Sequence, residues 1–92
     1  MPPKAKKLLE RMRRSKANWK RKDIETLYRG FGFEIKHGAN HDIVEHPDFP
    51  PLKRSIPRHN KLLEVYVRFA VRDIDTLLKL QEAEERDGEE DE

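Results

Sequence analysis

The sequence predicts an α+β fold, a two-layer α-β-β-β-α sandwich in which two helices cover one face of a three-stranded antiparallel sheet. Three observations lead to this prediction. Apolar residues recur at helical spacing around residue 27, alternate at strand spacing from residue 33, and return to helical spacing after residue 62. The chain has 92 residues, which is enough for one small domain at most.

The first predicted helix spans about residues 19–30. Its apolar positions follow the i, i+3, i+4, i+7 pattern of one helix face and are Ile24, Leu27, Tyr28 and Phe31. Asn18 has the side chain of an N-cap, and Gly30 or Gly32 provides a stop signal.

Three strands are expected after this helix. Phe33, Ile35 and His37 alternate with polar residues, as in a strand. Gly38-Ala39-Asn40 has the composition of a turn, so residues 41–46 can return as the second strand of a hairpin. Residues 47–51 contain three prolines and are expected to form a loop that exposes Phe49. Residues 53–56 then form the third strand.

The last predicted helix covers residues 63–81. Between residues 65 and 71 an alternating pattern competes with the helical one, but only the helical pattern continues past Asp73. The helical face consists of Leu63, Tyr66, Val67, Ala70, Ile74, Leu77 and Leu78.

Charge divides the chain into three parts. Residues 1–22 carry ten Lys or Arg and one acidic residue, whereas residues 82–92 carry eight acidic residues and one Arg. Blocks of like charge are usually solvated and mobile. We therefore expect a mobile basic arm over residues 1–17, a folded domain over residues 18–81 and a disordered acidic tail over residues 82–92. The arm is also suited to binding phosphates, or to contacting the tail.

Composition excludes several classes of site. There is no cysteine, so disulfides, thiolate metal sites and thiol nucleophiles are excluded. No apolar run approaches the roughly 20 residues that span a bilayer, and no hydrophobic signal segment follows the N-terminus. We expect a cytoplasmic protein without a membrane partner.

Three of the four histidines lie within residues 37–46. His37 and His41 have the spacing of a helical zinc pair, but Gly38 and Asn40 argue against a helix there, so no metal or other cofactor is expected. A histidine can instead act as acid or base near neutral pH, and RNA supplies its own 2′-OH nucleophile. Among the three, His41 follows a glycine turn that lets a phosphate approach closely, and His46 is expected at the surface.

The order of four motifs resembles the HicA toxins of HicA–HicB toxin–antitoxin systems, over about residues 18–81. These motifs are Gly32-Phe33, Gly38-Ala39-Asn40-His41-Asp42-Ile43, Ile56-Pro57-Arg58-His59 and the amphipathic helix that follows. The resemblance implies a double-stranded-RNA-binding-domain-like fold and the activity of an mRNA interferase, an endoribonuclease of a type II toxin–antitoxin system. It also implies a HicB-type antitoxin as partner.

The resemblance implies a catalytic role for His41, which matches the histidine of the family's Gly-Ser-His motif at the start of the second strand. Asn40 stands where the family often has Ser, and Ala39 where it often has Gly. A metal-independent reaction with His41 as general acid or base follows from this match. The residues expected to contact the RNA are Lys36, His37, Asn40, Lys53, Arg54, Arg58 and His59. Of these, Lys36, Lys53 and Arg54 are expected on the exposed face of the sheet.

Other interpretations remain open for the same residues. The basic side chains also fit a solvated strand face, His59 also fits a loop-ordering role, and Trp19 fits the core as well as a base-stacking surface. At the level of the whole chain, the alternatives are a non-catalytic RNA-binding module and a protein-interaction domain with charged ends.

Overall fold

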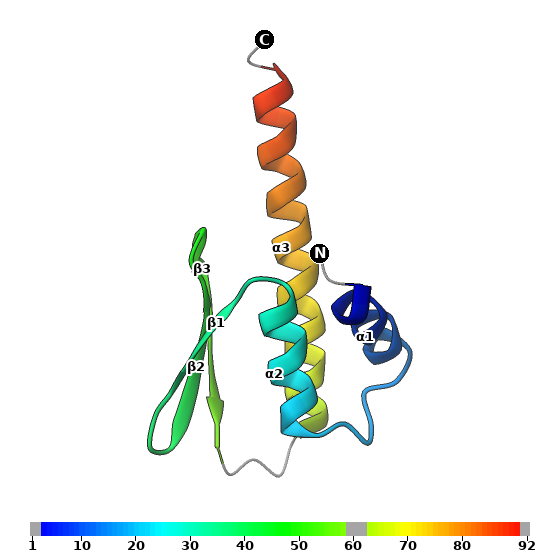
Figure 1. The fold of residues 1–92 in the computed structure, drawn as a ribbon, viewed down its shortest axis with the longest axis vertical. Helices are drawn as coiled ribbons and strands as arrows, with labels where there is room; N and C mark the ends of the chain where they lie inside the picture. The colour runs from blue at the N-terminus through cyan, green and yellow to red at the C-terminus, as the bar shows by residue number, and fades with distance from the viewer. Residues whose placement is uncertain (1–2, 59–62, 91–92) are drawn as a thin grey trace.

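The computed structural model describes residues 3–58 and 63–90 (Figure 1). Its elements are α1 (Pro3–Arg14), α2 (Arg21–Gly30), β1 (Glu34–His37), β2 (His41–His46), β3 (Phe49–Pro57) and α3 (Leu63–Glu90). The α+β class is confirmed, and so is the predicted order of one helix, three strands and one helix. The helix α1 is an addition to that prediction.

The three strands form an antiparallel sheet in the order β1-β2-β3. Helix α2 packs against β1 and α3 packs against β3, so both helices lie on the same side of the sheet (Figure 1). Residues that face the helices include Phe33, Val44 and Ile56, and all three are buried. No element within the described residues covers the opposite face, which we call the open face.

The apolar core lies between this sheet and the helices. It buries the side chains predicted for the first helix, together with Phe33 and the apolar face of α3. Its fully buried large side chains are Tyr28, Met12, Ile24, Leu27, Ile74, Leu77, Val44 and Val67. Trp19 is half-buried and packs against this core.

The prediction of a mobile basic arm over residues 1–17 is wrong for residues 3–14, which form α1. Ala5, Leu9 and Met12 follow a helical spacing and are buried against α2 and α3. The close approach of α1 to α2 requires Gly30, because a Cβ atom there would lie 2.3 Å from the Cβ atom of Ala5. In the sequence, the many basic residues between these apolar positions make the helical spacing of the stripe hard to recognise.

Helix α2 begins two residues later than predicted. Its N-cap is Lys20 rather than Asn18, and the carboxylate of Asp23 accepts the backbone N–H of Lys20 at 2.9 Å. Gly32 terminates the helix region with φ +88°, a left-handed conformation that glycine adopts without strain.

Strand β3 is longer than predicted and includes part of the proline-rich segment. The register pairs His46 with Phe49, so the chain reverses tightly and the strand begins before Pro50. Pro50 and Pro51 are compatible with a strand here because β3 is an edge of the sheet and has one free side. Phe49 is half-buried and packs against the core, contrary to the exposure expected for it.

Helix α3 continues to Glu90, beyond the predicted end at residue 81, and projects past the sheet and the other helices (Figure 1). The expectation of a disordered tail from residue 82 is therefore wrong up to residue 90. Residues 79–86 are good helix formers without a breaker, and Arg86 pairs with Glu82 at 2.6 Å, one turn earlier. No helix in the described part of the chain is long and apolar enough to cross a membrane.

Replacing Leu9 by Ala tests whether α1 belongs to the folded domain. We expect Leu9→Ala to lower the free energy of unfolding by about 2–3 kcal/mol, because it leaves a cavity between α1 and its neighbours. Lys6→Ala, at an exposed position of the same helix, is the control and should change stability by less than about 0.5 kcal/mol. Urea unfolding followed by circular dichroism measures both, and equal stabilities would show that α1 is not docked.

Candidate active site

His41 is the first residue of β2 and its side chain is exposed. Because side chains alternate along a strand and Asp42 is buried beneath the helices, His41 projects from the open face. Its ring forms no hydrogen bond or ion pair with any residue that the structure describes. The ring is therefore accessible to a ligand at this end of the sheet.

The backbone around His41 is fixed on both sides. Its carbonyl accepts the N–H of Gly38 at 2.9 Å, and His41 pairs with Pro57 of β3. A Cβ atom on residue 38 would lie 2.5 Å from that carbonyl oxygen, so the turn needs glycine at this position. The glycine turn inferred from sequence is thus present, whereas the approach of a phosphate to it stays a prediction.

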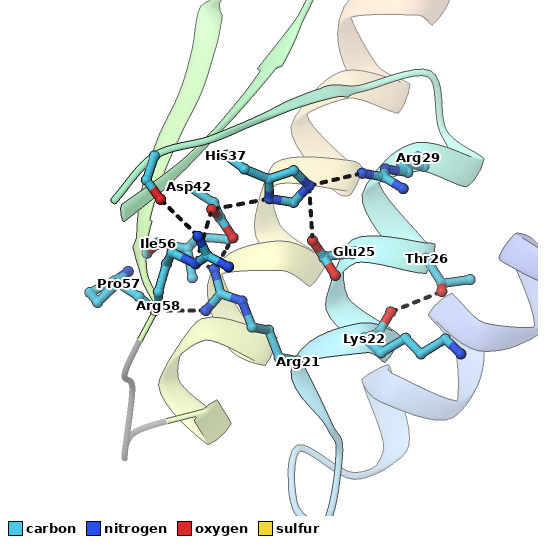
Figure 2. Close-up of polar contacts among 11 residues, drawn as sticks. Arg21, Lys22, Glu25, Thr26, Arg29, His37, Asp42, Ile56, Pro57 and Arg58 are labelled. Atoms are coloured by element: carbon cyan, nitrogen blue, oxygen red, sulfur yellow. Dashed lines mark hydrogen bonds and ion pairs between the residues drawn. The ribbon is translucent and has the colours of Figure 1, made fainter. Parts of the chain in front are cut away.

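Arg58 closes the hairpin turn from the end of β3. Its backbone N–H donates to the carbonyl of Asn40 at 2.8 Å, and its guanidinium donates to the carbonyl of Gly38 at 2.9 Å. Figure 2 shows the guanidinium beside the turn and Asp42. The guanidinium remains about half exposed. Arg58 and Asn40, both predicted to bind RNA, therefore lie next to His41, and each also has a structural role in the turn.

Lys36 and Lys53 share the open face with His41. Lys36 forms an ion pair with Glu45 at 3.1 Å and remains largely exposed. Lys53 is opposite Glu45 in the register and is also exposed. Their predicted position on an exposed sheet face is confirmed, whereas RNA contact stays a prediction.

Arg54 does not lie on the open face, and this expectation from sequence is wrong. Consecutive strand residues point to opposite sides, so Lys53 and Arg54 cannot share a face. The Arg54 guanidinium donates to both carboxylate oxygens of Asp73, at 2.6 and 2.8 Å, and lies 4.3 Å from the ring centroid of Phe69. The Tyr28 hydroxyl also donates to Asp73, at 2.6 Å. The pKa of Tyr28 is raised, mainly because the hydroxyl is buried and also because the Asp73 carboxylate is close. Arg54 therefore joins β3 to α3.

His37 and His46 also face the helices rather than the open face. His46 is buried, against the expectation of a surface position, and its Nδ1 atom accepts the Asp48 N–H at 3.1 Å. Its ring packs edge-to-face on Phe33 with centroids 5.1 Å apart. His37 pairs with Asp42 in the register and lies above α2. Only His41 among these three histidines projects from the open face, and His59 lies outside the described residues.

The His37 ring belongs to a charged cluster between the hairpin and α2 (Figure 2). Its Nδ1 atom lies 3.2 Å from Asp42 Oδ1, and its Nε2 atom lies 3.9 Å from Glu25 Oε1. Arg29 approaches the same Nε2 atom at 3.4 Å. These partners hold the ring against α2.

Asp42 is at the centre of this cluster and was not singled out from sequence as a structural residue. Arg21 donates to its Oδ2 atom, and Arg21 also donates to the carbonyl of Pro57 at 2.6 Å. The Oδ1 atom has no hydrogen bond but faces His37, with Arg58 Nε at 3.8 Å. Burial favours a higher pKa for Asp42, but the hydrogen bond from Arg21 and the His37 ring beside Oδ1 outweigh it and lower the pKa. The sequence signal for its position was the strand alternation, which points the side chain of residue 42 to the other face of the sheet from that of His41.

Glu25, His37 and Asp42 offer ligand atoms within 4.8 Å of one another, which is a possible arrangement for a metal ion. Three guanidinium groups surround them, from Arg21, Arg29 and Arg58. These cations already neutralise the two carboxylates, so a divalent ion would meet a net positive environment. The charges favour an ion-pair network that holds the hairpin on α2.

Comparison of the chain with protein-family models, with curated proteins and with solved structures gives no match. The chemistry open to this site therefore follows from its own residues. It combines an exposed imidazole on a rigid strand start with a glycine turn and nearby cationic groups.

Asp42→Asn tests the cluster. We expect the substitution to lower the free energy of unfolding by about 3 kcal/mol at neutral pH, because Arg21 loses its buried counter-charge. Since the pKa of Asp42 is lowered in the folded state, its stabilisation is complete above the ordinary carboxyl range and is lost as pH falls below about 4.

Urea unfolding between neutral pH and acid measures both effects. Wild-type stability should fall more steeply towards acid than that of Asp42→Asn. Asp48→Asn changes an exposed carboxylate close by in the chain and is the matched control, with stability near wild type. Parallel acid profiles for wild type and Asp42→Asn would contradict the pKa direction.

Proposed function

We propose that this chain is an endoribonuclease that cleaves RNA with His41 as general acid or base, without a metal ion. The single observation that carries the proposal is the exposed His41 ring on the open face, which has no partner among the described residues and stands on a backbone fixed by Gly38, Pro57 and Arg58. The fixed backbone sets where the ring starts, which is one part of the pre-organisation that a catalytic side chain needs.

The proposed reaction uses a nucleophile of the substrate. The 2′-OH of one nucleotide attacks the adjacent phosphorus, its proton leaves to a base, and the departing 5′-oxygen receives a proton from an acid. His41 can perform either transfer near neutral pH. The half-exposed Arg58 guanidinium lies at the end of the same turn, between the Gly38 carbonyl and Asp42. From this edge of the hairpin, rather than from the open face itself, it is suited to offset the charge that develops on the phosphate.

We further propose that the protein is an mRNA-cleaving toxin and that its partner is a HicB-type antitoxin. The support is the resemblance of the motifs together with the order α2-β1-β2-β3-α3, which is the order that the resemblance implies. An antitoxin that inhibits such an enzyme would cover His41 on the open face.

A non-catalytic RNA-binding module is the second candidate. One observation favours it: within the described residues no second histidine shares the open face with His41, and the carboxylates of that face, Glu34 and Glu45, lie at the far end of the β1–β2 pair from His41. This candidate predicts RNA binding that weakens with salt, without cleavage products.

His41→Ala distinguishes the candidates. We expect the variant to cleave a labelled RNA at least about 100-fold more slowly than wild type, because one proton transfer loses its catalyst. The fold should persist, since the His41 ring has no described partner. Gel analysis of cleavage in the presence of EDTA measures the rates, and cleavage by His41→Ala at the wild-type rate would refute the assignment.

His37→Gln is the matched control on the other side of the same hairpin. It should retain cleavage if catalysis occurs on the open face. Loss of cleavage in His37→Gln but not in His41→Ala would show that catalysis takes place at the cluster around Asp42 instead. Loss of wild-type cleavage on adding EDTA would point to a metal at Glu25, His37 and Asp42.

A further inference from the structure

A second basic surface lies between α1 and α2. Helix α1 lies on the far side of α2 and α3 from the sheet (Figure 1). It is a groove of about 570 Å³, a volume typical of ligand sites. Its side chains include five cationic groups and one aromatic ring: Lys4, Lys7, Arg11, Lys20, Lys22 and Trp19. None of these residues belongs to the His41 site.

The positive charge of this groove is largely uncompensated. Asp23 is the one acidic residue in its lining, and its carboxylate already accepts the N–H of Lys20 at the start of α2. The acidic part of α3 does not cover the groove, because α3 carries it away beyond the other elements (Figure 1). Uncompensated cations in a groove attract a polyanion.

Trp19 gives the groove a stacking surface. Its Nε1 atom donates to the carbonyl of Ser15 at 2.8 Å, and the Arg11 guanidinium lies 5.2 Å from the ring centroid. Indole rings and guanidinium planes both stack on nucleic-acid bases. Cations with a fixed aromatic ring fit a single strand, whose phosphates and unstacked bases are both available, better than a duplex.

The groove approaches the His41 end of the molecule at the start of α2. Lys20 and Lys22 line the groove, and Arg21 between them donates to the carbonyl of Pro57. Pro57 is the residue that pairs with His41. Arg21 therefore reaches from the edge of the groove to the strand that pairs with His41. The His41 ring itself projects from the other side of the sheet, so the path from the groove to His41 runs past the end of the hairpin.

We propose that the α1–α2 groove binds single-stranded RNA and delivers one strand around the start of α2 towards His41. The delivery step rests on the proposed ribonuclease function, whereas binding in the groove does not. In this complex the lysines bind successive phosphates of the RNA, and one base stacks on the Trp19–Arg11 pair.

Trp19 is the only tryptophan of the chain, so its fluorescence reports directly on the groove. The full chain carrying His41→Ala is titrated with an oligouridylate of about 12 nucleotides, which separates binding from cleavage. We expect quenching of Trp19 and an affinity that falls with salt.

Lys7→Gln combined with Arg11→Gln should reduce the affinity at least about tenfold and reduce the slope of log affinity against log salt by about 1.4. Because Arg11 contacts the reporter ring, anisotropy of a labelled oligouridylate provides the second readout. Arg72→Gln combined with Lys79→Gln removes the same charge from exposed positions of α3 and should leave both readouts unchanged.

Equal affinities for the groove and control variants would overturn the inference, and so would equal competition by a polyglutamate peptide, which would show a general polyanion surface. The cleavage assay decides the proposed function separately. Quenching without any cleavage by the wild type would refute the ribonuclease and leave the groove as an RNA-binding site.

Discussion

The buried carboxylate of Asp42 is the constraint on which the candidate site depends. A charge at this depth is tolerated only with partners, and the partners come from three parts of the chain: Arg21 at the start of α2, His37 in β1 and Arg58 after β3. Together they fix the hairpin on the helix. His41 precedes Asp42 on the strand, so holding Asp42 inward holds His41 outward.

A second charged connection joins the other edge of the sheet to the helices. Arg54 of β3 and Tyr28 of α2 both donate to Asp73 of α3. These two networks tie the sheet to the helices near β1 and near β3, while the apolar core fills the space between. The open face is left with exposed residues around His41, so binding there requires little reorganisation of the fold.

The highly charged ends of the chain have different structural roles. In α1 the basic residues surround an apolar stripe, and packing of Ala5, Leu9 and Met12 makes this segment part of the domain. Over residues 82–86 of α3 the charged side chains are exposed, and the helix continues there through local propensity and pairs such as Glu82 with Arg86. Both segments were predicted to be mobile from their charge alone. A count of charges does not show the helical spacing of the apolar residues between them.

The sequence by itself determined the class and order of the central elements, the glycine turn and the exposed start of β2, because hydrophobic period and turn chemistry are local properties. Only the tertiary structure decided which charged side chains face the helices. Neighbouring strand residues such as Lys53 and Arg54 must face opposite sides, but only the register shows that Arg54 meets Asp73 and that Lys53 lies in solvent. Asp42 and Arg21 are 21 residues apart, and no local sequence pattern predicts that they pair. Such contacts arise from packing between distant segments, which is also why the groove between α1 and α2 became visible only in the folded chain.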